Sequence, residues 1–202
     1  MNKYLFTLLM LTPLLASGQF VKGDKFIGGT FRLNSQTPTK SDQSSTYEVK
    51  GFSIYPTMGF LLNEKFAIGG QIGYSYLNTV YNNNQSSQSK YNSKGYSLGL
   101  ISRRYFSISE KFIFSINGQV NYDRGKQTSS NSTSESVTEN YQIGIYIEPC
   151  FIFFPTPKWG IETSIGSIGY NYSRDLSTDL GQNYSNLTYG TINLGLAYYF
   201  RK

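Results

Sequence analysis

The segment before the terminal basic pair, Asn193 to Phe200, has the sequence NLGLAYYF. Its large apolar residues alternate with small or polar ones: Leu194, Leu196, Tyr198 and Phe200 against Asn193, Gly195 and Ala197. A period of two is that of a β-strand whose two faces meet different surroundings. The same alternation returns along most of the chain, so the sequence predicts an all-β fold.

The first 19 residues have the pattern of an export signal. Lys3 supplies a positive start, an apolar run extends from Tyr4 to Leu15, and Ala16-Ser17-Gly18 is a small-residue cleavage site. That run is too short for a spanning helix, which needs roughly 20 apolar residues. We therefore expect a signal peptide at 1–19, and one β-domain at 20–202.

Eight segments have the pattern of a tilted membrane strand and are long enough to cross, which takes about 9–11 residues. They are Lys25–Asn34, Val49–Leu62, Phe66–Asn78, Lys94–Phe106, Phe112–Asp123, Tyr141–Phe154, Trp159–Tyr172 and Thr188–Phe200. Short links alternate with long ones at 35–48, 79–93, 124–140 and 173–187. The long links are rich in Ser, Asn, Gln and Thr, so we expect four long, polar, solvated surface loops on one rim.

Assigning alternate residues to two faces gives one apolar face per strand, bounded by aromatic residues. The aromatic positions at the short-link end are Phe66, Phe106, Phe112, Phe153, Trp159 and Phe200, and those at the long-link end are Tyr76, Tyr96, Tyr122 and Tyr141. Two aromatic rings around an aliphatic belt are typical of the two interfaces of a membrane. In the seventh strand Tyr170 and Tyr172 have the wrong parity, which predicts a bulge near Gly169.

The ending Asn193-x-Gly195-x-x-Tyr198-x-Phe200, the leader, the alternation and the unequal links together resemble the outer-membrane β-barrel domain family, the small barrels grouped with OmpA and OmpX. The resemblance implies an eight-stranded antiparallel up-and-down transmembrane β-barrel in a Gram-negative outer membrane. It further implies that Asn193, Gly195, Tyr198 and Phe200 form the insertion signal read by the barrel-assembly machinery. The short-link ring would then be the periplasmic aromatic girdle, and outer-membrane lipid the surrounding partner.

Four charged residues have inward parity: Arg32, Arg103, Glu148 and Glu162. Buried charges are costly unless they are paired, so we predict an Arg/Glu network across the lumen, with Tyr55, Gln71 and Asp123 as candidates to extend it. An eight-stranded barrel is only just wide enough for side chains to fill it. The network is thus expected to plug the lumen, and the rival interpretation is a gate.

Catalysis has little support in this sequence. It contains no His, which removes the usual general base and metal ligand, and Cys150 is its single cysteine. We expect no cofactor, no metal and no catalytic site. Without Lys3 the chain has 17 basic and 12 acidic residues, a net charge of +5, and the basic residues are scattered along it. No nucleic-acid partner is therefore predicted.

The predicted role is non-catalytic, either structural or through a surface partner, of unknown identity, that binds the loops. A narrow porin-like channel for ions or very small solutes is the first alternative. The second is a soluble ligand-binding β-barrel, in which the apolar face would line the cavity.

Overall fold

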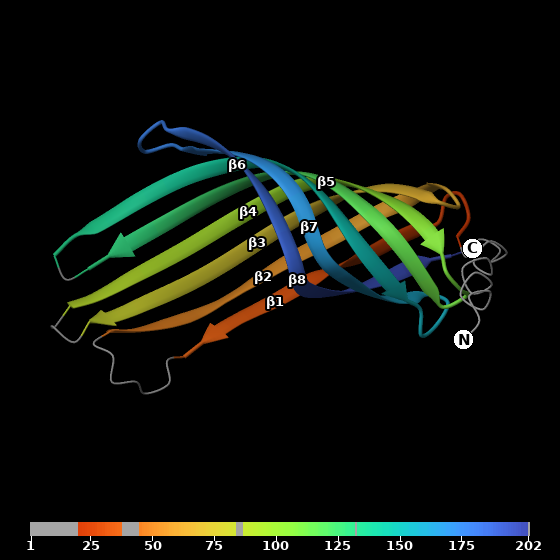
Figure 1. Cartoon of the computed structure of the whole chain (residues 1–202), viewed down its shortest axis with the longest axis horizontal. Coiled ribbons are helices and arrows are strands. Elements are labelled where there is room, and N and C mark those ends of the chain that lie inside the picture. Colours follow the sequence, from red (N-terminus) through yellow and green to blue (C-terminus); the bar gives the residue numbers. More distant parts are fainter. Residues whose placement is uncertain (1–19, 38–44, 84–86, 132, 202) are drawn as a thin grey trace, which may run out of the picture.

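The protein is a closed barrel of eight antiparallel strands in consecutive order (Figure 1). The computed structural model describes residues 20–37, 45–83, 87–131 and 133–201, so the expected signal peptide lies outside the described residues. The strands are β1 (Lys25–Gln36), β2 (Ser45–Asn63), β3 (Phe66–Asn83), β4 (Ser87–Ser107), β5 (Phe112–Ser130), β6 (Glu135–Phe153), β7 (Trp159–Asp175) and β8 (Gly181–Phe200). Among the described residues, no helix is long and apolar enough to cross a membrane.

Strand β1 closes the barrel by pairing with both β2 and β8. Its register with β2 runs over twelve residue pairs, from Lys25↔Phe60 to Gln36↔Val49. Its register with β8 runs over only six, from Lys25↔Phe200 to Thr30↔Gly195. Beyond that point β1 and the β7–β8 hairpin diverge toward the loop side, as Figure 1 shows. The β1–β8 seam is therefore the shortest junction of the barrel.

The alternation predicted from the sequence is present, with the apolar side chains outside. Leu98, Leu100 and Ile145 are more than half exposed on the outer surface, whereas Ser115 and Asn117 are buried in the interior. A soluble barrel that encloses an apolar ligand requires the opposite arrangement. That alternative is therefore wrong, because an outer surface of this kind is stable only in contact with lipid.

Three of the four predicted long loops, 79–93, 124–140 and 173–187, are mostly strand where the structure describes them, which corrects the expectation of four long polar loops. Backbone pairing continues to Asn83↔Ser87 in the β3–β4 hairpin and to Ser130↔Glu135 in the β5–β6 hairpin. Polar composition did not prevent this, since a ladder of backbone hydrogen bonds needs no apolar side chain once the barrel has aligned the two strands. Cross-strand aromatic contacts support the extension, with the Tyr81 ring 6.0 Å from that of Tyr47 and 5.5 Å from that of Tyr91.

The extended hairpins reach well beyond a membrane. The 19-residue strand β5, at a rise of about 3.3 Å per residue and a tilt of about 40°, spans roughly 48 Å, nearly twice an apolar band of about 25 Å. The β7–β8 hairpin ends in a tight turn instead. There the Asp175 carboxylate accepts hydrogen bonds from the backbone N–H groups of Ser177 and Thr178, which hold the pKa of that carboxyl below its usual value.

The bulge expected near Gly169 lies three residues earlier. The register of β7 shifts between Ser164 and Gly166, and Gly166 has a φ of 135°, a conformation that favours glycine. As a result Ile165 and Ile168 both face outward, and Tyr172 reaches the outer ring of Tyr141, with centroids 6.1 Å apart. The bulge thus restores the outer aromatic ring that strict alternation would have broken.

Shortening the β5–β6 hairpin tests whether the extension is independent of the barrel. Replacing residues 129–136 by Asn-Gly joins Thr128 to Val137, two positions that are already paired, through a two-residue hairpin turn. The shortened protein should fold and unfold in urea within about 0.5 kcal/mol of the full chain, because the removed segment pairs outside its own hairpin only through Ser129 and Ser130, at the outer end of β4. Heat-dependent gel mobility and urea titration measure this, and failure to form the heat-resistant barrel would contradict it.

Candidate functional site

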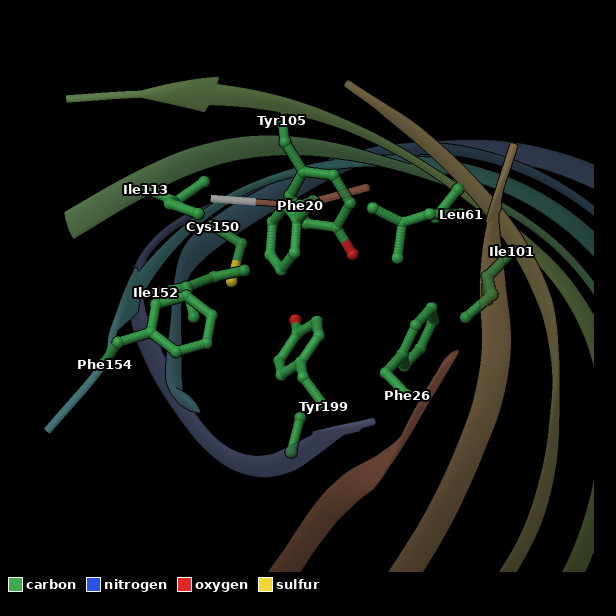
Figure 2. Close-up of a cluster of buried hydrophobic side chains, with 12 residues drawn as sticks. Phe20, Phe26, Leu61, Ile101, Tyr105, Ile113, Cys150, Ile152, Phe154 and Tyr199 are labelled. Atoms are coloured by element: carbon green, nitrogen blue, oxygen red, sulfur yellow. The ribbon is translucent and has the colours of Figure 1, made fainter. Parts of the chain in front are cut away.

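The interior of the barrel is closed at its short-turn end by an apolar plug. Figure 2 shows this cluster, whose twelve members are Phe20, Phe26, Leu61, Ala67, Ile101, Tyr105, Ile113, Cys150, Ile152, Phe154, Ala197 and Tyr199. The sequence analysis predicted a polar interior along the whole barrel. That prediction is wrong at the short-turn end, where the interior is apolar. Side chains from most strands converge here and pack together, so they fill this end of the barrel.

Phe20 lies at the centre of the plug, although it precedes the first strand. Its ring centroid is 4.7 Å from that of Tyr105, 5.2 Å from that of Tyr199 and 5.9 Å from that of Phe154. The guanidinium of Arg201 covers the same cluster, 4.7 Å from the Phe20 centroid. Residues from both ends of the domain therefore close one mouth of the barrel (Figure 2).

A turn at residues 21–24 directs Phe20 into the barrel. The Asp24 N–H donates to the Val21 carbonyl at 3.2 Å, and Gly23 has a φ of 90°, as the third position of a type II turn requires. The Asp24 carboxylate accepts the Val21 N–H at 3.0 Å, and the Gly23 N–H donates to the Leu61 carbonyl at 2.9 Å. The sequence Val-Lys-Gly-Asp thus carries a turn signal that the strand pattern did not use.

Above the plug, two of the four predicted lumen charges form an ion pair. The Arg103 Nη1 lies 2.7 Å from the Glu162 Oε1, and both side chains are about nine-tenths buried. The Tyr199 hydroxyl donates to the same Glu162 oxygen at 3.0 Å. The pair therefore sits directly on the plug and is hydrogen-bonded to it.

The other two predicted charges pair with amides instead of with each other. Arg32 donates from Nη2 to the Asn193 Oδ1 at 2.5 Å, and the Gln119 amide approaches the Glu148 Oε2 at 3.5 Å. All four charged residues, with Tyr55, Gln71 and Asp123, line one interior cavity of about 290 Å³. The structure thus gathers the predicted residues around a single polar chamber, which they do not fill.

The residues predicted as the insertion signal occupy both faces of β8. Asn193 and Gly195 line the chamber, and Asn193 also donates to the Ser164 hydroxyl at 3.2 Å. Tyr198 lies on the outer face with Phe200, which is exposed, and the Tyr198 ring is 5.1 Å from that of Trp159 and 4.9 Å from that of Phe200. Recognition of this segment by an assembly machinery stays a prediction.

The predicted girdle residues form an outward band at the short-turn rim. Phe106, Phe112 and Trp159 are exposed, Phe66 and Phe153 are half-buried, and the rings of Phe112 and Phe153 are 4.8 Å apart. Sequence reasoning missed Arg104, which faces outward at the level of Phe66, its partner in register. Its guanidinium lies 5.5 Å from the Phe106 ring centroid, as expected for an arginine that extends to a membrane interface.

The outer surface also gathers basic residues that the sequence interpretation had taken as scattered. Lys94 is the register partner of Lys126, and Arg124 is the partner of Tyr96. These residues lie some thirty positions apart along the chain, and only the pairing of β4 with β5 makes them neighbours. The sequence alone did not reveal this cluster, because it does not give the register between β4 and β5.

Chemistry-bearing groups in the interior are few. Cys150 is a free thiol buried between the plug and the chamber. Among the described residues, no three His, Cys, Asp or Glu side chains are placed to hold a metal ion. The arrangement thus offers a closed, polar, charge-paired interior and a broad lipid-facing exterior.

Comparison with known proteins gives a likeness at the level of fold. No protein-family model and no curated protein matches the sequence. Among solved structures, Ail, the attachment invasion locus protein of Yersinia pestis, is 17% identical, with a TM-score of 0.51 over 89% of this chain and 100% of its own. The outer membrane protein OprG from Pseudomonas aeruginosa is 12% identical, with a TM-score of 0.52 over 92% of this chain and 100% of its own. A major outer membrane protein from Thermus thermophilus is 10% identical, with a TM-score of 0.51 over 88% of this chain and 99% of its own.

The fold and the lipid-facing belt together define the class of this protein. It has the fold of the small eight-stranded outer-membrane β-barrels, and the resemblance seen in the sequence is confirmed for the fold. The apolar exterior and the polar interior are the arrangement expected of a membrane-spanning β-barrel.

The Arg103–Glu162 pair should behave as a buried ion pair. Replacing one partner, as in Arg103→Met or Glu162→Leu, leaves an uncompensated charge and should destabilise the barrel by about 3–5 kcal/mol. The double variant R103M/E162L removes both charges and should recover most of that loss. Urea unfolding in lipid vesicles measures all three, and losses that simply add in the double variant would contradict the coupling.

Proposed function

We propose that this protein is a non-catalytic outer-membrane barrel that is closed to solutes and acts through its outward hairpins. The observation that carries the proposal is the apolar plug, in which Phe20 and its neighbours close the periplasmic mouth. The polar chamber above the plug has its charges paired or hydrogen-bonded, as a structural interior requires. The complete absence of His from the sequence supports the non-catalytic part.

The extended hairpins support a role outside the membrane. Strands β3 to β6 continue past the outer tyrosine ring as paired, largely polar ribbons. Exposed groups near the outer ends of the strands include Tyr81 on β3, Val137 on β6 and Tyr47 on the adjacent β2. An ordered ribbon presents such groups in a fixed arrangement, which lowers the entropic cost of binding a partner. This supports a surface-interaction role over a purely structural one.

Ion conductance tests the closed barrel. The wild-type protein in a planar bilayer should show no discrete conductance steps, because an apolar, dry plug excludes hydrated ions. Phe20→Ala should allow brief openings and should reduce stability by up to about 3–5 kcal/mol, the cost of truncating a buried Phe. Phe31→Ala, on the lipid-facing surface, is the matched control and should stay silent. Steady conductance of the wild-type barrel would overturn the proposal in favour of the narrow porin-like channel.

The surface role has its own test in intact cells. A photo-crosslinking residue at Val137, near the tip of the β5–β6 hairpin, should give a discrete adduct if this hairpin meets a partner. The same residue at Ile116, on the lipid-facing part of β5, is the matched control. A lack of adducts at Val137 and at equivalent tip positions would contradict the surface-interaction role and favour a purely structural one.

A further inference from the structure

A basic patch lies on the outer surface, immediately beyond the outer tyrosine ring. On both β4 and β5, cationic side chains on the outward face lie farther from the short-turn end than the tyrosine. On β4 these are Lys94 and Lys90, beyond Tyr96, and on β5 they are Arg124 and Lys126, beyond Tyr122. We call Lys90, Lys94, Arg124 and Lys126 the basic patch. All four side chains are exposed, and the strand pairing places Lys94 opposite Lys126.

The height of the patch corresponds to the outer membrane interface. The outward face of β5 from Phe112 to Tyr122 covers eleven residues, and that of β4 from Phe106 to Tyr96 also covers eleven. A tilted strand crosses the apolar layer in about 9–11 residues. The next outward positions, Lys94 and Arg124, therefore lie where the lipid head groups begin.

A surface hollow of about 460 Å³ gives the patch the form of a site. It is lined by Tyr76, Asn92, Lys94, Lys126 and Thr128 from three adjacent strands. The Tyr76 hydroxyl donates to the Asn92 Oδ1 at 3.2 Å, which orients that amide beside the two lysines. Two ammonium groups with hydroxyl and amide donors are suited to the oxygens of a phosphate.

The neighbouring charges leave the patch cationic. Glu139 on β6 contacts Arg124 at 3.0 Å and Lys126 at 3.6 Å, so one carboxylate is shared by two cations. Lys90 and Lys94 form no ion pair with any of the residues that the structure describes. By contrast, the cations on β2 and on β7 each have an acidic partner, Lys50 with Glu48 and Arg174 with Asp179.

We propose that the basic patch binds the phosphorylated head group of an outer-leaflet lipid, with the phosphate in the hollow between Lys94 and Lys126. The acyl chains of that lipid would lie against the apolar belt directly below, on Leu98, Leu100 and Val120, which are exposed on the same strands. The inference rests on the membrane location of the barrel and is independent of whether the lumen conducts. Its occupant is a lipid because the site adjoins the lipid-covered surface.

Lipid binding to the purified full-length barrel tests the proposal. The probe is diphosphoryl lipid A, added to nanodiscs of phosphatidylcholine that contain the protein. The variant K94Q/K126Q should bind the probe roughly 30-fold more weakly, from a loss of about fivefold for each lysine removed near an anionic group. The difference should shrink as salt is raised, since exposed charges are screened. The control K65Q/K111Q removes two exposed lysines at the opposite rim and should bind as the wild type does.

Two further probes distinguish binding of the whole lipid from binding of its phosphate alone. Lipid A stripped of its phosphates should bind K94Q/K126Q and wild type equally and weakly, and inorganic phosphate alone should bind neither measurably. Equal affinity of wild type and K94Q/K126Q for the diphosphoryl probe would overturn the proposal, as would an equal loss in K65Q/K111Q. Tight binding of inorganic phosphate would overturn the lipid assignment. Heat-dependent gel mobility verifies folding, and the single variant K94Q replaces the double variant if the latter does not fold.

Discussion

The constraint on which this structure depends is that lipid offers no hydrogen-bond partner to a peptide group. A strand surrounded by lipid must therefore have its backbone paired on both sides, and a sheet can satisfy this only by closing on itself. Closure then determines the rest: with eight strands the interior is narrow, alternate side chains meet lipid, and their neighbours crowd into the lumen. The polar chamber and the apolar plug are two solutions to the same crowding at different heights.

The two solutions are linked by a single group of contacts. Glu162 is paired with Arg103 and also receives the hydroxyl of Tyr199, whose ring packs against Phe20 in the plug. Charge pairing in the chamber and aromatic packing at the mouth are thus parts of one continuous arrangement. Such a connection fixes ring and guanidinium positions more firmly than either kind of contact would alone.

Alternation in the sequence predicted the eight strands, and the aromatic residues at the two ends of the apolar faces predicted which face points outward. It failed where structure depends on pairing between distant positions. The polar segments past Tyr122 and Tyr141 lack apolar side chains, yet the barrel aligns them and their backbones pair. Lys94 and Lys126 meet only through the hairpin register, which composition does not reveal. Phe20 was assigned to no element because it lies between the expected leader and the first strand. Its position depends on a turn at Gly23 that period-two reasoning does not detect.

The six-pair junction between β1 and β8 has a mechanical meaning. Each of the other seven junctions joins consecutive strands through a covalent turn and holds at least twelve pairs. The β1–β8 contact has neither advantage, so a force that pulls neighbouring strands apart meets its lowest resistance there. The barrel is thus a sheet of eight strands, consecutive in the chain, that is closed by one short β1–β8 pairing. Phe20 and Tyr199, two residues of the apolar plug, lie at the short-turn end of this β1–β8 pairing.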